Sequence, residues 1–160
     1  MAQFNDWCET SDEQVGIHYS RVITGQLESI EVGVGATASI VPGHYASEEH
    51  VARALRRLGK PAAAALIEEK LPTTKNIRSG DLGEIFATEW IDGYSSGCPA
   101  ASNPPRWKHP RNMAMRGEDV IGMLLDPQTQ RLHFLKTEAK SRVALTAQVL
   151  TEARIGLDKE

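Results

Sequence analysis

The stretch Asp119–Lys140, DVIGMLLDPQTQRLHFLKTEAK, contains two apolar runs that are separated by a turn signal. The turn signal is the segment Asp126–Gln130, and residues of this kind reverse the chain between strands. The stretch therefore predicts a β-hairpin. Folding at this turn carries Asp119 back along its strand to the level of Glu138. Lys140 follows Glu138 by two positions, so both side chains leave the same face of an extended chain.

Two carboxylates and one amine that converge on a point are what metal-assisted phosphodiester hydrolysis requires. Mg²⁺ takes oxygen ligands and keeps several waters. Asp119 and Glu138 are therefore candidate ligands for Mg²⁺ or Mn²⁺, with the main-chain carbonyl of Ala139 as a further oxygen. Lys140 would lie beside the attacking water, where its charge offsets the negative charge of the pentavalent phosphate.

Two simpler interpretations of the same residues stay open. Glu138 and Lys140 can form a buried structural ion pair, or they can be solvated charges on a strand. The pattern Glu-x-Lys occurs by chance in many proteins, so it is not specific by itself. The predicted hairpin and an upstream glutamate, Glu84, favour the metal site.

The order of these residues resembles that of the PD-(D/E)xK nuclease superfamily: Glu84 on a helix, then Asp119, then Glu138-x-Lys140. A closer likeness, over residues 79–142, is to the nuclease subunit of Hachiman anti-phage systems. The segment Ser79–Ile85, SGDLGEI, looks like the Ser-Gly-acid-Leu-Gly-Glu opening of that family.

Further positions carry the same resemblance. Lys108, Asn112 and Gly117-x-Asp119 fall where the Hachiman family has a lysine, an asparagine and a Gly-x-Asp. Gln148 lies on the predicted last helix, where related nucleases often have a Gln or Lys that faces the site.

The resemblance implies a DNA nuclease with a catalytic set of Glu84, Asp119, Glu138 and Lys140. Glu84 would be a third metal ligand or a supporting group. It also implies an α/β (α+β) fold with a restriction-endonuclease-like core, in which a mixed sheet is flanked by helices. An anti-phage role and a helicase partner that licenses cleavage follow from the family alone.

The resemblance places the nuclease core at residues 79–160. The superfamily core has a further strand after the last helix, and the sequence leaves no room for it after Glu160. Either the chain is truncated, or this strand is replaced by the N-terminal strands or by a partner.

A basic segment precedes Asp119. Residues 106–116 carry four Lys/Arg residues and no acid, in a chain with a net charge of −3. Phosphates must be drawn toward a metal site that is itself anionic, so we expect Lys108 and Arg111 to contact DNA, together with Asn112 and Gln148. Trp107 can stack on a base, or it can anchor a loop against the core.

The N-terminal part is predicted to have three sections. Residues 1–14 are polar, acidic and without periodicity, which is typical of a flexible arm. Residues 15–78 contain alternating apolar patterns that predict strands at 15–20, 30–34 and 37–41, closed by Pro42-Gly43. Two helices should then follow, and Ser79 is expected to cap a third.

The two predicted helices are bounded by capping signals. Ser47 should cap the first helix, which ends at Gly59. Its apolar stripe consists of Val51, Ala54, Leu55 and Leu58. Pro61 should open the second helix, which runs to Lys70. The basic residues of this region can form a DNA-binding face, but a solvated outer face balanced by Glu68 and Glu69 is favoured; they are Arg53, Arg56, Arg57 and Lys60.

Composition limits the remaining function classes. A chain of 160 residues with 41% hydrophobic residues can bury one modest core. The net charge of −3 argues against a protein that coats nucleic acid through bulk charge. Cys8 and Cys98 have no partners at zinc spacing and are expected to be free thiols of a cytoplasmic protein without a membrane span.

Two rival functions follow from the same sequence. One is a catalytically inactive nuclease-fold domain that acts as a scaffold or regulator of a partner, although such a domain has no need for Asp119, Glu138 and Lys140 at one point. The other is a small-molecule or nucleotide-binding domain. Gly33-Val34-Gly35 lacks the spacing of a phosphate-binding loop, which argues against the second rival.

Overall fold

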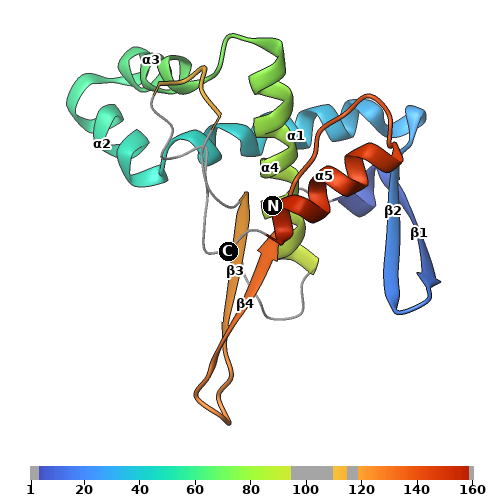
Figure 1. The fold of residues 1–160 in the computed structure, drawn as a ribbon. Coiled ribbons are helices and arrows are strands. Elements are labelled where there is room, and N and C mark those ends of the chain that lie inside the picture. Colours follow the sequence, from blue (N-terminus) through green and yellow to red (C-terminus); the bar gives the residue numbers. More distant parts are fainter. Residues whose placement is uncertain (1–3, 95–109, 115–118, 159–160) are drawn as a thin grey trace. The chain divides into compact units, whose positions relative to one another are not determined.

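The computed structural model describes residues 4–94, 110–114 and 119–158. In these residues the chain combines helices with two small sheets, so the predicted α+β class is confirmed (Figure 1). The chain divides into two compact units, Met1–Val41 and Pro42–Glu160.

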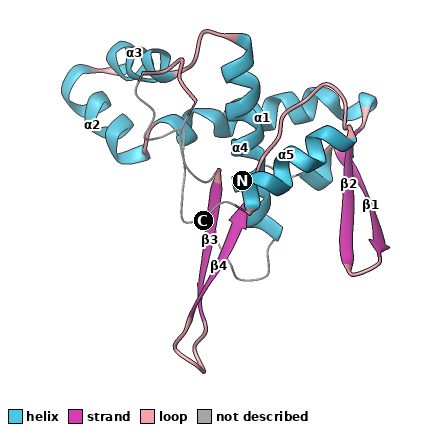
Figure 2. Cartoon of the chain, viewed as in Figure 1, coloured by secondary structure: helices cyan, strands magenta, loops and turns pink. Residues whose placement is uncertain are grey.

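The mixed sheet expected from the sequence is not found in the described ranges. Both sheets have two antiparallel strands, which Figure 2 colours magenta. Each strand pairs with its neighbour in the chain through a short turn, and such a connection produces antiparallel pairing. The restriction-endonuclease-like core stays a prediction.

The first sheet is an N-terminal hairpin of β1 (Cys8–Val15) and β2 (His18–Gly25). Its ladder closes at the pair Val15–His18, and Gly16 in the turn has a φ of 64°, which glycine adopts without steric cost. The single strand predicted at 15–20 is therefore wrong, because the chain reverses inside it. The predicted arm at 1–14 likewise contains most of a paired strand.

Helix α1 (Ile30–Tyr45) replaces the two strands predicted at 30–34 and 37–41. The alternation of Ile30, Val32 and Val34 suggested strands, but all three are exposed. The buried or half-buried residues in the first part of the helix follow a helical period instead: Gly33, Ala36, Thr37 and Ile40. Pro42 lies inside this helix and does not end it. A Cβ at Gly33 would come within 2.5 Å of the Trp7 ring, so the helix packs directly on that indole.

Short 3-10 turns flank the N-terminal hairpin at Phe4–Asp6 and Leu27–Ser29. In the second unit, α2 (Glu48–Leu58) and α3 (Lys60–Lys70) form a helical pair, as predicted. Ser47 caps α2 by accepting a hydrogen bond from the main-chain N–H of His50, and Gly59 ends the helix with a φ of 84°.

Helix α4 (Lys75–Tyr94) begins one turn earlier than expected, so Ser79 lies inside it and does not cap it. The start is held from outside the helix. The amide side chain of Asn112 accepts a hydrogen bond from the N–H of Thr73 at 2.8 Å and donates one to its hydroxyl at 2.8 Å. This contact comes from a residue far along the chain, so no local signal could place it.

The predicted second hairpin is confirmed, with β3 (Val120–Leu125) and β4 (Leu132–Thr137) paired antiparallel. Asp126 shapes its turn by accepting hydrogen bonds from the N–H of Gln128 at 2.8 Å and from the hydroxyl of Thr129 at 2.6 Å. The final helix, α5 (Ala147–Leu157), is capped by Thr146. No helix in the described part of the chain is long and apolar enough to cross a membrane.

Candidate functional site

The register of the second hairpin sets the geometry of the candidate site. Val120 pairs with Thr137 at the open end of the ladder, so Asp119 and Glu138 are the next residues on the two strands. The carboxylate of Asp119 crosses this opening and accepts a hydrogen bond from the main-chain N–H of Ala139, with 2.6 Å between the N and Oδ2. The two predicted metal ligands are therefore held at one end of one hairpin.

Lys140 lies at the same place. Its ammonium donates a hydrogen bond to Oε1 of Glu138 and forms an ion pair with it. The Glu138 side chain is 11% exposed and that of Lys140 is 24% exposed, so the pair is shielded but not sealed from water. The pairing fits both interpretations of the sequence, the catalytic lysine and the structural ion pair.

Helix α5 lies directly against Glu138. A Cβ placed at Gly156 would lie 2.5 Å from Oε1 and 2.7 Å from Oε2 of Glu138, too close for any real side chain. Glycine at this position therefore allows the helix backbone to approach the carboxylate. Sequence reasoning missed Gly156, although a glycine inside a helix often has a packing reason.

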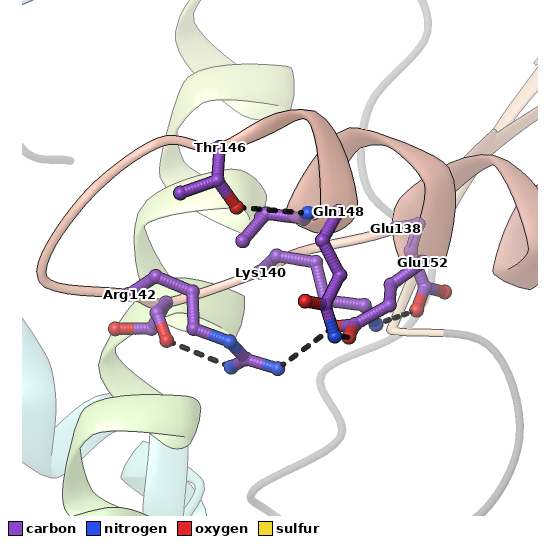
Figure 3. Close-up of polar contacts among 8 residues, drawn as sticks. Glu138, Lys140, Arg142, Thr146, Gln148 and Glu152 are labelled. Atoms are coloured by element: carbon purple, nitrogen blue, oxygen red, sulfur yellow. Dashed lines mark hydrogen bonds and ion pairs between the residues drawn. The ribbon is translucent and has the colours of Figure 1, made fainter.

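A polar contact connects the middle of α5 with the segment that follows Lys140. Glu152 accepts a hydrogen bond from Arg142 at 3.2 Å and one from Gln148 at 3.0 Å. Figure 3 draws these contacts together with the Glu138–Lys140 pair and the Thr146 cap. Gln148, which was predicted to bind nucleic acid, is thus held by Glu152 on its own helix.

Helix α4 is tied to the same segment. The hydroxyls of Ser79 and Ser141 are 2.7 Å apart, and a Cβ at Gly83 would meet the Cβ of Ser141 at 3.4 Å. Glu84 is the next residue along this helix after Gly83. Its charge also acts on Tyr45, one of the causes that raise the pKa of that phenol above its ordinary range.

Tyr45 belongs to a buried polar cluster that the sequence did not predict. Its hydroxyl donates a 2.5 Å hydrogen bond to Asp81 of α4, whose exposed fraction is 4%. Burial raises the pKa of Tyr45 most, and the hydrogen bond to Asp81 adds to it. His44 forms a second buried contact, of 2.7 Å, with Glu89. The two contacts join the end of α1 to the helix that carries Glu84.

The donor set at the hairpin opening suits a hard divalent cation. The carboxylates of Asp119 and Glu138 and the carbonyl of Ala139 supply oxygens only, which Mg²⁺ and Mn²⁺ accept. Among the described residues, no group of three or more His, Cys, Asp and Glu is placed to hold a metal ion.

The other residues predicted to contact nucleic acid differ in where they lie and in what they contact. Lys108 and Trp107 lie outside the described residues. Arg111 is exposed and donates a 3.3 Å hydrogen bond to the carbonyl of Glu68, which leaves its charge facing solvent. Asn112 holds Thr73 at the start of α4, which is a structural role. Whether any of these residues binds nucleic acid stays a prediction.

The fold and the site together define an α+β protein with an acidic and a basic side chain gathered at the end of a hairpin. The chain belongs to the HamA family (Hachiman system protein A), whose family model matches residues 1–160, the whole chain. The predicted closeness to the Hachiman nuclease subunit is thus confirmed, and membership implies a role in a defence system with a partner. No curated protein matches the chain.

Proposed function

We propose that this chain is a metal-dependent DNA nuclease that serves as the effector of a Hachiman anti-phage system. The observation that carries the proposal is the register of the β3–β4 hairpin, which sets Asp119 and Glu138 at one opening with the Lys140 ammonium on Glu138. Family membership supports the defence role. We expect the protein to act in the cytoplasm, where phage DNA enters.

The residues divide the chemistry among them. Asp119 and Glu138, with the Ala139 carbonyl, would hold Mg²⁺ or Mn²⁺. When bound, such an ion activates water and stabilises charge on a phosphate. The N–H of Ala139 fixes the Asp119 carboxylate, so its second oxygen keeps a defined direction. Lys140 carries a positive charge to the point where the phosphate oxygens gain negative charge during hydrolysis. Glu84 would support the site from α4.

We propose that a partner protein controls cleavage. The net charge of −3 gives the chain weak intrinsic attraction for DNA, and an always-active nuclease would cut the DNA of its own host. By analogy with the family, we infer that a DNA-translocating helicase is the partner that delivers DNA to the site. The free chain should then cut slowly.

The test is cleavage of supercoiled plasmid in Mg²⁺, with and without the partner, by the wild type and by Lys140→Ala. Arg131→Ala, which removes an exposed cation near the turn of the same hairpin, is the matched control. We expect cleavage to be lost in Lys140→Ala and kept in the control. Thermal unfolding should change little in both variants.

The rival function is a catalytically inactive scaffold in which Glu138 and Lys140 form a structural ion pair. The two side chains are partly buried, as a structural ion pair would be, so the experiment needs a result that identifies the scaffold. Removing one partner of a buried pair costs about 3–5 kcal/mol. A large fall in melting temperature in Lys140→Ala, with no Mg²⁺-dependent cleavage by the wild type and its partner, would establish the scaffold.

A further inference from the structure

The α2–α3 pair contains an apolar groove of about 330 Å³. Ala54 and Leu58 from α2 and Leu66 from α3 form its apolar lining. Leu58 is 73% exposed, although the sequence pattern places it on the buried stripe of its helix. The groove is therefore an apolar surface that the fold leaves open to solvent.

Basic side chains also line this groove. Arg53 and Arg57 lie one turn apart on α2, and Lys70 lies at the end of α3. His50 completes the polar lining, and none of the described residues that line the groove is acidic. Because the chain as a whole carries a net charge of −3, this is a local reversal of charge.

The combination of apolar and basic side chains along one groove favours one kind of occupant. A nucleic-acid backbone would satisfy the arginines but would leave the leucines exposed. An amphipathic helix with acidic residues beside its apolar face would cover the leucines and pair with the arginines at once. We propose that this groove binds an acidic amphipathic helix of the defence-system partner. The proposal rests on the proposed function only in assuming that partner.

The test is a binding titration of the full chain with the purified partner, at low and at high salt. Arg53→Glu with Arg57→Glu reverses the charge of the basic lining, and Leu58→Ser replaces an apolar lining residue with a polar one. Arg56→Glu and Leu55→Ser are the matched controls, because both residues are exposed on α2 and neither lines the groove. We expect each groove variant to raise the Kd about tenfold or more, and the controls to leave it unchanged. High salt should also raise the wild-type Kd.

Three results would overturn the proposal. One is an unchanged Kd in the groove variants. Another is equal weakening in Arg56→Glu, which would indicate bulk charge. The third is loss of affinity for a short DNA duplex with partner binding intact, which would assign the arginines to nucleic acid. Plasmid cleavage by the free chain should be the same in all variants, so a failed nuclease assay and a failed docking site are distinguishable.

Discussion

The carboxylate of Asp119 accepts a 2.6 Å hydrogen bond from the main-chain N–H of Ala139, across the opening of the β3–β4 hairpin. The bond joins the two strands beyond their last ladder pair, Val120 with Thr137. Oδ2 of Asp119, a candidate metal ligand, therefore also takes part in a structural hydrogen bond. Asp119 therefore has two roles that substitution can separate.

Asp119→Asn is expected to keep the fold and lose the metal. The amide oxygen of asparagine can still accept the bond from Ala139, so the melting temperature should fall by only a few degrees. The negative charge is gone, and affinity for Mg²⁺ or Mn²⁺ should fall by at least about tenfold, since hard cations depend on carboxylate charge. Calorimetric titration with Mn²⁺ measures this, and unchanged affinity would exclude Asp119 as a ligand.

Gly156→Ala should damage catalysis more than stability. Alanine favours a helix by about 0.5–1 kcal/mol over glycine, which partly offsets any strain. The new methyl group would displace the Glu138 carboxylate, and a displacement on this scale can lower the rate by on the order of 10²-fold.

The control for Gly156→Ala is Gly80→Ala on α4. Gly80 is also helical and exposed, and an added Cβ there meets nothing within 4 Å. It should raise stability and leave cleavage unchanged. Equal cleavage rates in Gly156→Ala and the wild type would mean that the position of Glu138 against α5 has no catalytic importance.

Tyr45→Phe is expected to destabilise the second unit by about 1–3 kcal/mol, because it removes a hydrogen-bond donor from the buried carboxylate of Asp81. Chemical denaturation measures the change. Tyr19→Phe on the exposed N-terminal hairpin is the control, and we expect a smaller loss there because the Tyr19 phenol is exposed to solvent whereas Asp81 is buried. Equal losses in the two variants would contradict a specific role for the Tyr45–Asp81 contact.

Asp12 should titrate far below an ordinary aspartate. Arg21 donates two hydrogen bonds of 2.6 Å to its carboxylate, and with Tyr19 lowers its pKa to about 2. A lowered pKa means that the pair stabilises the hairpin above the ordinary aspartate pKa, and that this contribution is lost as the pH falls through about 2.

An NMR titration of the Asp12 carboxyl carbon measures this pKa directly. In Arg21→Gln the pKa should return toward its ordinary value. Asp126 is the internal control, because its lowered pKa comes from Thr129 and Gln128 and should not respond. An ordinary pKa for Asp12 in the wild type would show that the ion pair does not form in solution.

The second hairpin was predictable because the residues that determine it are close together in sequence. The turn at 126–130 and the apolar runs beside it fix which residues face each other, and the alignment of Asp119 with Glu138 follows. Helix α1 was not predictable in the same way. A short alternation of Ile and Val fits a strand, and only packing on Trp7 and contacts such as Tyr45 with Asp81 make the helical alternative visible.

The site was predictable in part for a related reason. Glu138 and Lys140 are neighbours in sequence, so their pairing follows from spacing. The approach of Gly156 to Glu138 and the hold of Asn112 on Thr73 join distant segments, and nothing in a local pattern encodes them. The roles of Lys108, Arg111 and Gln148 in binding nucleic acid stay predictions.

The paired residues of β3 and β4 are close to one another in sequence, so this part of the site can be built by local contacts. The outermost pair of the second ladder is Val120 with Thr137, and a loop this short closes quickly, with little loss of chain entropy. Asp119 and Glu138 can therefore reach their alignment through the hairpin alone. The approach of α5 to Glu138 is a separate tertiary contact, and we expect the hairpin to align its two carboxylates with or without it.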